Sequence, residues 1–204
     1  MKSLRLYVGC ATWAVGGAND HLLPHVAGGN LARYAARLTA AEVNSSFHRE
    51  HRPATWGRWA RSVGPSFRFS VKLPKSITHE RRLVDVEALL DGFAAGVHLL
   101  GEKLAVVLSF LAERHVARVG ADPAVVPAAA EPGGWSGLRY FRLHGSPVTY
   151  RSPYDGEFLR SLVARLEPGD WCIFDNTASG AALPNAVELL ARLAAPRALP
   201  DHGA

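Results

Sequence analysis

Charged and polar side chains stand at the ends of three short hydrophobic runs in this 204-residue sequence. The runs are AEVNSSFHRE, FRFSVKLPKSITHE and RYFRLHGSPVTY, and their polar residues are Glu42, Asn44, Lys72, His79, Arg142 and His144. Enzymes built on parallel strands gather their reactive residues at the carboxyl ends of those strands. The pattern therefore predicts a site at one rim of a parallel sheet before it indicates any reaction.

Glu42 and Lys72 suggest proton-transfer chemistry. Glu42 and Asn44 share one face of an expected strand, and the alternation in FRFSVKL puts Lys72 on the face opposite Phe69 and Val71. An inward carboxylate near Lys72 could act as a general base, while Lys72 steers an anion or stabilises an enolate. Two alternatives stay open: a Schiff base at Lys72, and a buried Glu–Lys pair that only supports the structure.

Arg142 is the best candidate for binding an anion, because its planar guanidinium matches a carboxylate or a phosphate. His144 follows on the same strand face. Loops after the last two strands often bind phosphate in barrel enzymes, and here they contain Gly145, Ser146, Asn176 and Thr177. A single histidine at such a position is more often a hydrogen-bonded core residue, but several polar residues on one rim favour a functional site.

A metal site is not expected, and neither is a cofactor. The residues that could supply oxygen and nitrogen ligands are Glu42, His79, Asp122, His144 and Asp175. No His-x-Glu or paired-carboxylate spacing connects them. Trp13, at the end of the first expected strand, is instead a candidate for stacking on a sugar.

Composition predicts an ordinary globular protein with 48% hydrophobic and 20% charged residues. The formal charge of +5 permits nucleic-acid binding, yet the arginines are dispersed, which favours a solvated surface. Two cysteines, Cys10 and Cys172, exclude a disulfide scaffold and point to a cytoplasmic location. No run is long enough to span a membrane, and the basic, apolar start is read as a strand and not as a signal peptide.

Strand-like and helix-like segments alternate along the chain. Strands are expected at 5–12, 41–45 and 67–73 and within LRYFRLHG and DWCIFDN, with helices between them and a final helix in ALPNAVELLARLAA. This order predicts an α/β fold with a parallel sheet. One domain is expected over 1–195, followed by a disordered tail at 196–204.

The middle of the chain is expected to be helical from 102 to 114. Leu104, Val107, Leu108 and Leu111 are spaced i, i+3, i+4, i+7. If 104–108 were a strand, only seven residues would carry the chain to a parallel partner at Val116, where about 10–12 are needed. We therefore expect the strand at 116–121 to pair with the strand that holds Lys72, in an incomplete ring with an imperfect seam.

The chain resembles the DUF72 (YecE-like) family of TIM-barrel proteins. The matching blocks are YVGCATW, AEVNSSFHR, FRFSVKLPKSITHE, VARVGADP, LRYFRLHGSP with Tyr150 and Tyr154, and CIFDNTASGAA. Family blocks that read Gln-Leu-Pro-Pro and Glu-x-Arg-His are absent, which implies an internal deletion and a TIM-barrel-like sheet of about six or seven strands. The resemblance implies a sugar-isomerase-like grouping without an assigned reaction.

These observations together predict a protein that binds a small phosphorylated or polyhydroxylated compound, with isomerase-like or lyase-like proton transfer. The expected catalytic residues are Glu42, Lys72 and His144, and the expected substrate contacts are Trp13, Asn44, His79, Arg142, Tyr150 and Asn176. A basic protein associated with nucleic acid and an inactive, degenerate family member are the alternatives.

Overall fold

The computed structural model describes residues 5–108 and 117–195. The expected tail at 196–204 lies outside the described residues. Within the described part, strands and helices alternate for most of the chain, so the α/β fold class predicted from the sequence is confirmed.

Within residues 5–108 and 117–195, seven parallel strands form two sheets, in the orders β1-β9-β8-β6 and β2-β3-β4. Their bounds are β1 (Tyr7–Cys10), β2 (Ala40–Val43), β3 (Arg68–Lys72), β4 (Leu104–Leu108), β6 (Gly120–Asp122), β8 (Tyr140–Leu143) and β9 (Trp171–Phe174). Two short strands, β5 (Ala117–Arg118) and β7 (Gly133–Gly134), form a separate antiparallel pair. The arrangement is an incomplete TIM-barrel-like sheet with the expected number of strands.

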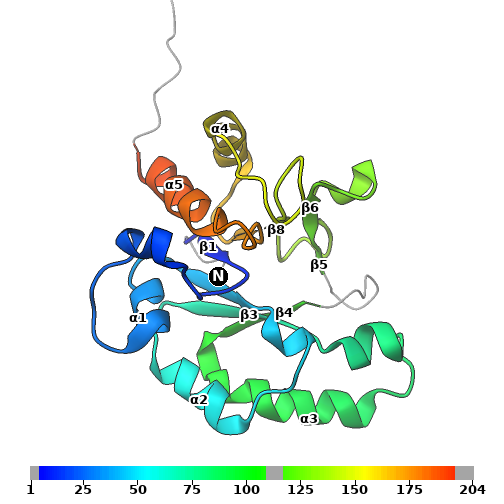
Figure 1. Ribbon diagram of the computed structural model, residues 1–204. Helices are drawn as coiled ribbons and strands as arrows, with labels where there is room; N and C mark the ends of the chain where they lie inside the picture. The colour runs from blue at the N-terminus through cyan, green and yellow to red at the C-terminus, as the bar shows by residue number, and fades with distance from the viewer. Residues whose placement is uncertain (1–4, 109–116, 196–204) are drawn as a thin grey trace, which may run out of the picture.

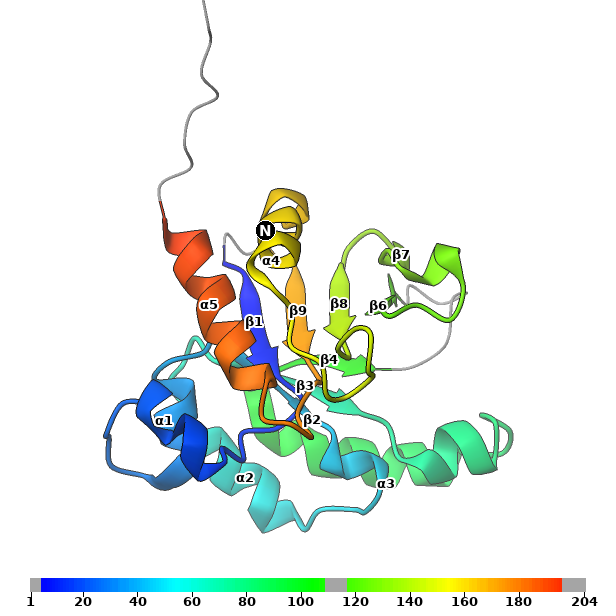
Figure 2. The ribbon, with the colours of Figure 1, turned by 45° about the horizontal axis from the view of Figure 1, so that its top comes forward.

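Helices surround the two sheets (Figure 1). The α-helices are α1 (Gly29–Ala35), α2 (Pro53–Arg61), α3 (Glu87–Val97), α4 (Gly156–Arg165) and α5 (Ala182–Ala194). Short turns of 3₁₀-helix or π-helix are η1 (Gly17–Leu22), η2 (Ser45–Phe47), η3 (Ser76–Glu80), η4 (His98–Lys103) and η5 (Pro127–Ala129). Figure 2 shows α5 beside β1, and α2 and α3 on the side of β2, β3 and β4. Asp155 caps α4 by accepting hydrogen bonds from the N–H groups of Glu157 and Phe158.

Side chains join β1 to β2 where the two sheets meet. The Tyr34 hydroxyl accepts a hydrogen bond from the Cys10 N–H (2.7 Å) and donates one to the Ala40 carbonyl (3.0 Å). The two backbones approach so closely that a Cβ at Gly9 would lie 2.0 Å from the Ala40 oxygen. The Thr39 hydroxyl, in addition, accepts from the Val8 N–H (2.8 Å). This junction therefore needs glycine on one strand and a tyrosine hydroxyl between the strands.

The expected helix at 102–114 is wrong at residues 104–108, which form β4, whereas residues 102–103 belong to η4. This strand pairs in parallel with β3, with Lys72 opposite Leu108. Gly101 kinks η4 at φ 57° and ψ −138°, η4 ends at Lys103, and the run LAVVL then forms the strand. Residues 109–114 lie outside the described part of the chain.

The expected pairing of a strand at 116–121 with β3 is also wrong. β6 pairs with β8, and β5 pairs with β7. The expectation from connection length assumed that a strand at 104–108 would pair in parallel with the strand that begins at Val116. In the described part of the chain β4 and β6 stand at the edges of different sheets and do not pair with each other. The long crossover that a parallel pair requires is therefore not needed between them.

The two cysteines lie on neighbouring strands, as expected. Cys172 is opposite Val8, and Cys10 is opposite Phe174. Strand spacing of ~4.8 Å and a two-residue offset of ~6.6 Å put their Cα atoms about 8 Å apart. Both thiols are buried, and burial raises the pKa of Cys10 to about 12, so neither serves as a thiolate at neutral pH.

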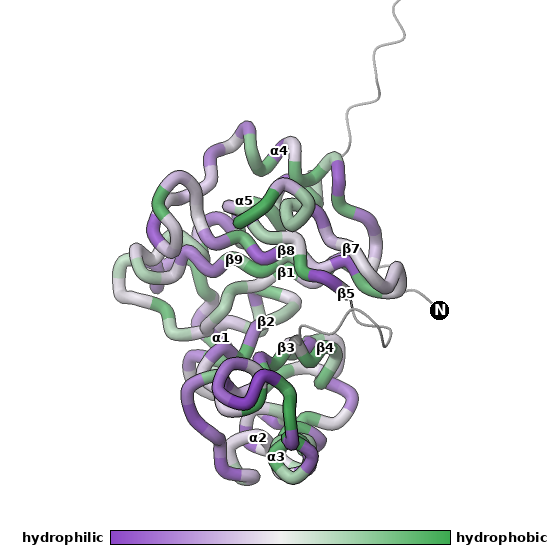
Figure 3. Tube along the Cα trace, turned by 90° about the vertical axis from the view of Figure 1, so that its right-hand side faces the viewer, coloured by the Kyte–Doolittle hydropathy of each residue, from purple (hydrophilic) through white to green (hydrophobic). Residues whose placement is uncertain are grey.

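Alternation along the strands separates an outer apolar face from a barrel interior. Phe69 and Val71 face the helices in the main hydrophobic core. Inside the barrel, Trp171 lies between the rings of Tyr7 and Tyr140, with centroids at 4.8 and 5.7 Å. Figure 3 shows a hydrophobic stretch along β4. The aromatic stack fills the interior below the charged residues described next.

Candidate functional site

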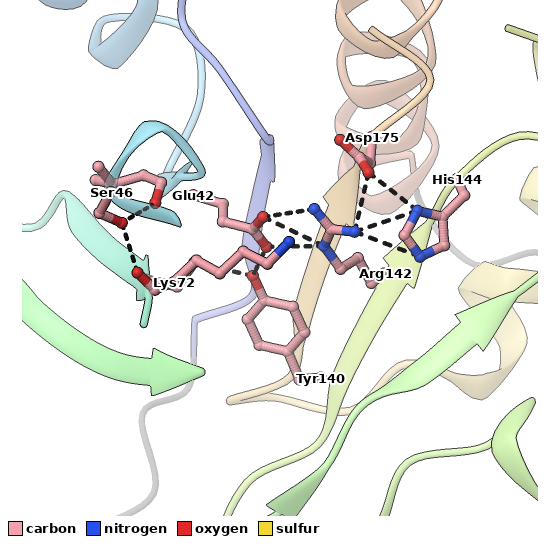
Figure 4. A network of polar contacts seen from close by, with 9 residues as sticks. Glu42, Ser46, Lys72, Tyr140, Arg142, His144 and Asp175 are labelled. Atoms are coloured by element: carbon pink, nitrogen blue, oxygen red, sulfur yellow. Dashed lines mark hydrogen bonds and ion pairs between the residues drawn. The ribbon is translucent and has the colours of Figure 1, made fainter. Parts of the chain in front are cut away.

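Glu42 and Arg142 form a buried ion pair across the barrel (Figure 4). Glu42 is 0% exposed on β2, and Arg142 extends from β8 with 11% of its side chain exposed. Arg142 Nη2 donates to Glu42 Oε1 at 2.7 Å, and Nε lies 3.1–3.2 Å from both carboxylate oxygens. Burial alone would lower the pKa of Arg142, but the charge and hydrogen bonds of Glu42 raise it above its usual value. The guanidinium of Arg142 therefore stays charged.

Asp175 holds the other side of the same guanidinium. Its Oδ2 lies 2.9 Å from Arg142 Nη1 and 3.0 Å from His144 Nδ1. Arg142 Nη1 also lies 3.2 Å from His144 Nδ1, which cannot both donate to Asp175 and accept from Arg142. We assign the Nδ1 proton to the bond with Asp175, because a carboxylate is the stronger acceptor. In this tautomer Nε2 carries no proton, and it lies 3.4 Å from Arg142 Nη1.

Tyr140 and Ser70 support Glu42 from below. The Tyr140 hydroxyl donates to Glu42 Oε2 at 2.9 Å, and Ser70 Oγ lies 2.9 Å from the same hydroxyl. Burial, and then the charge of Glu42, raise the pKa of Tyr140 well above its usual value, so the hydroxyl remains a donor. Glu42 thus receives bonds from Tyr140 and Arg142 on both of its oxygens.

Lys72 points into the barrel toward Glu42 and Arg142, as the alternation predicted (Figure 4). Its ammonium lies 4.0 Å from the centre of the Phe47 ring, a cation–π distance. It forms no ion pair with any residue in the described ranges 5–108 and 117–195. Burial, and then the charge of Arg142, lower its pKa, while Glu42 and Asp175 oppose that shift. The side chain is half-buried, so solvent and a ligand can reach it.

Tyr150 and His79 lie at the rim of this cluster. The Tyr150 ring stands edge-on to His144, with centroids 5.5 Å apart, and its side chain is exposed. His79 is exposed, and it packs edge-on to the Phe47 ring that carries Lys72. Tyr150 therefore contacts the charged cluster directly at His144, whereas His79 contacts Phe47, the ring against which the Lys72 ammonium lies.

Asn44 and Asn176 have different surroundings. Asn44 begins η2, and in the described part of the chain its buried Oδ1 has no hydrogen-bond donor. Asn176 is fully buried and donates to the Ser152 carbonyl and to Asn185 Oδ1, both at 2.9 Å. The Oδ1 atoms of both residues are buried without a donor among the described residues, and the NH₂ group of Asn176 holds a loop against α5.

Trp13 lies away from the charged residues. Its ring packs edge-on to Trp59 and Phe69, with centroids 5.0 and 6.1 Å apart. These neighbours belong to the core between the sheet and the helices. The ring of Trp13 therefore contributes to packing, and the stacking on a sugar that the sequence suggested stays a prediction.

Comparison with known proteins assigns the chain to a family. A profile described as "Protein of unknown function DUF72" matches residues 7–109 and 105–203. The chain belongs to the DUF72 family. Its two matched segments meet at 105–109, the region in which the sequence comparison expects the deletion. No curated protein matches.

Solved DUF72 structures share the fold. A DUF72 protein from Enterococcus faecalis V583 superposes with a TM-score of 0.72 at 16% identity, over 94% of this chain and 96% of the other. One from Thermotoga maritima MSB8 gives 0.71 at 19% identity, over 92% and 98% of the two chains. At these identities the likeness extends to the fold alone.

Sequence reasoning did not select several residues of this DUF72 site, namely Ser46, Phe47, Ser70, Tyr140 and Asp175 as a contact of Arg142. A signal was present for two of them. Ser70 precedes Lys72 by two residues, and Tyr140 precedes Arg142 by two, so each shares a strand face with a chosen residue. Extending the alternation downward along β3 and β8 would have found them.

No metal centre is evident in the part of the chain that the structure describes. No three His, Cys, Asp or Glu side chains there are grouped so that they could hold an ion. Asp122 instead accepts a hydrogen bond from Tyr154 at 2.9 Å.

Among the described residues, no helix is both long and apolar enough to cross a membrane.

Proposed function

We propose that this DUF72-family chain binds a small anionic, polyhydroxylated compound, such as a sugar phosphate, and moves a proton on it as an isomerase or a lyase does. The observation that carries the proposal is the state of Lys72. It is a half-buried cation at the carboxyl end of β3, within a polar cluster, and no described carboxylate pairs with it. An anionic ligand would supply the missing partner.

The contacts of Arg142 leave Lys72 as the cation that can meet a ligand. Glu42 and Asp175 both pair directly with Arg142. The N–H groups of Arg142 point at these carboxylates and at His144, so few remain for a ligand. Arg142 therefore orients the cluster, and Lys72 contacts the anion.

His144 is the better placed proton carrier. Both oxygens of Glu42 accept hydrogen bonds, so using it as a base would break the ion pair. His144 is oriented by Asp175, with 16% of its side chain exposed, and its Nε2 lies 3.4 Å from Arg142 Nη1, a long contact that a substrate would replace. Removing a proton beside a carbonyl group creates an enolate, which the ammonium of Lys72 would stabilise.

The surface arginines support a small ligand over a nucleic acid. Those in ion pairs with carboxylates include Arg33, Arg139, Arg165 and Arg192. Their positive charge is partly balanced within the chain, which lowers the attraction for a phosphate backbone.

Thermal unfolding with inorganic phosphate tests the proposal. At constant ionic strength, phosphate at ten times its Kd should stabilise the protein by about 1.4 kcal/mol, or roughly 3–6 °C in Tm. Lys72→Met should lose this gain. Lys75→Met, which removes an exposed lysine of the following turn, should keep it. An equal gain in both variants would remove Lys72 from the site.

A further inference from the structure

A cavity lies outside the charged cluster, between the loop after β1 and the start of α5. Its volume is about 330 Å³, at the lower end of the range for small-molecule pockets. Residues 14–19 form one wall, and residues 177–180 with Ala182 and Leu183 form the other. Cys10 and Tyr34 lie at its inner end. We call it the β1–α5 pocket.

The lining of the β1–α5 pocket is uncharged. Although the chain carries a net charge of +5, no Asp, Glu, Lys, Arg or His is among the described residues that line it. Polar side chains come from Thr12, Asn19, Thr177 and Ser179, and the rest is largely glycine, alanine, valine and leucine. Such a lining offers hydrogen bonds at a few points on an apolar surface.

The two walls are tied together, so the pocket exists without a ligand. Asn19 Nδ2 donates to the Gly180 carbonyl at 2.7 Å, which joins the β1 loop to the segment before α5. The Tyr34 hydroxyl is held by the backbones of β1 and β2. A preformed pocket spares the ligand the free-energy cost of ordering its site.

We propose that the β1–α5 pocket binds an uncharged, hydroxylated aliphatic molecule of the size of a pentose or a pentitol. The lack of a cation in the lining disfavours a phosphate. A planar heterocycle finds no free ring to stack on, because Tyr34 is the one aromatic residue among the described lining and its hydroxyl is fixed in the β1–β2 junction. Hydroxyl groups match Thr177 and the oxygen atoms of Thr12, Asn19 and Ser179, and the carbon chain matches the alanines. Thr12 also accepts from the Ala14 N–H, and Asn19 and Ser179 donate to the carbonyls of Gly180 and Arg151.

The pocket is separate from the site of Lys72, although it borders it. Asp175 points to Arg142, whereas Thr177, two residues later, lines the pocket. None of the residues in the Glu42–Arg142–Asp175–His144 cluster belongs to the lining. Binding in the pocket is therefore independent of the proposed anion site, and the two can be tested separately.

The experiment is an amide NMR titration of the full chain with D-xylose, xylitol, adenosine and inorganic phosphate. Xylose or xylitol should shift the signals of residues 12–19 and 177–183. Gly16→Phe fills the pocket from a position where a Cβ meets nothing within 4 Å and φ is −69°. It should weaken binding at least tenfold. Gly64→Phe, at an equally open glycine outside both sites, should change binding less than twofold.

Further variants keep the two sites distinguishable. Ala178→Phe blocks the opposite, exposed wall and should act like Gly16→Phe, so a folding defect in one variant leaves the other as a test. Lys72→Met should bind xylitol normally. The proposal is overturned if neither xylose nor xylitol shifts these signals at 100-fold molar excess and above. It is equally overturned if both filled variants still bind, or if adenosine or phosphate binds the pocket more tightly.

Discussion

Removing the guanidinium of Arg142 should strongly destabilise the protein. Arg142→Met keeps much of the side chain's length and removes its charge. Glu42, which is fully buried, and Asp175, also buried, then lose their common counter-ion. An uncompensated buried charge costs far more than the intact pair contributes.

The size of the effect follows from the contacts. Removing one partner of a buried ion pair costs about 3–5 kcal/mol. Because two carboxylates are stranded, we expect at least the middle of that range, about 4 kcal/mol. For a protein of this length that lowers Tm by roughly 8–16 °C.

Urea unfolding at several pH values measures it. Carboxylates without a counter-ion take up protons on acidification, so the folded variant binds more protons than the unfolded chain. The loss in free energy of unfolding caused by Arg142→Met should therefore be largest near pH 8 and shrink toward pH 5. The double variant Glu42→Gln/Arg142→Met should recover part of the loss. Arg160→Met, at an exposed arginine of α4, should change stability by less than about 0.5 kcal/mol.

A loss below about 1 kcal/mol for Arg142→Met, or a deficit that grows on acidification, would refute this reasoning. Either result would mean that Glu42 and Asp175 are solvated or protonated in the folded protein. The site would then have a different charge from the one described here.

Three further predictions concern the β1–β2 junction and Lys72. Gly9→Ala should cost at least about 3 kcal/mol in urea unfolding, because its Cβ would meet the Ala40 oxygen; a near-neutral effect would disprove the close approach. Tyr34→Phe should cost about 1–3 kcal/mol by leaving two buried backbone groups without a partner, and a variant as stable as the parent would contradict that role. The lowered pKa of Lys72 means that burying its ammonium costs stability below the folded-state pKa, and that this cost vanishes as pH rises toward the ordinary lysine value of about 10.4. Lys72→Met should accordingly gain most over the parent at neutral pH and lose that gain at high pH in thermal scans, whereas a gain that grows with pH would show that the pKa is raised.

Alternation along single strands made part of this site predictable. FRFSVKL has one register that buries Phe69 and Val71, and that register leaves Lys72 facing the interior. The same rule places Arg142 on the inner face of β8, and the partners of both residues lie on other strands. That Arg142 would sit between Glu42 and Asp175 depends on how β2, β8 and β9 are placed around the interior, which no local pattern encodes.

The run at 104–108 shows where pattern reasoning fails. Leu104, Val107 and Leu108 fit a helical period, yet five apolar residues fit a buried strand equally well. The β-branched Val106 and Val107, and the kink at Gly101 three residues before the run, favoured the strand. Trp13 is a similar case, because a tryptophan after a strand fits a binding site and a hydrophobic core alike, and here it packs on Trp59.

A crystal structure of the protein soaked with glycerol 3-phosphate tests the central claim most directly. This probe combines the anion and the hydroxyl groups of the proposed ligand class. The account predicts a phosphate oxygen within hydrogen-bond distance of Lys72 Nζ, a hydroxyl near His144 Nε2, and an unchanged Glu42–Arg142–Asp175 network. A phosphate bound elsewhere, with Lys72 still on the Phe47 ring and free of ligand, would contradict it.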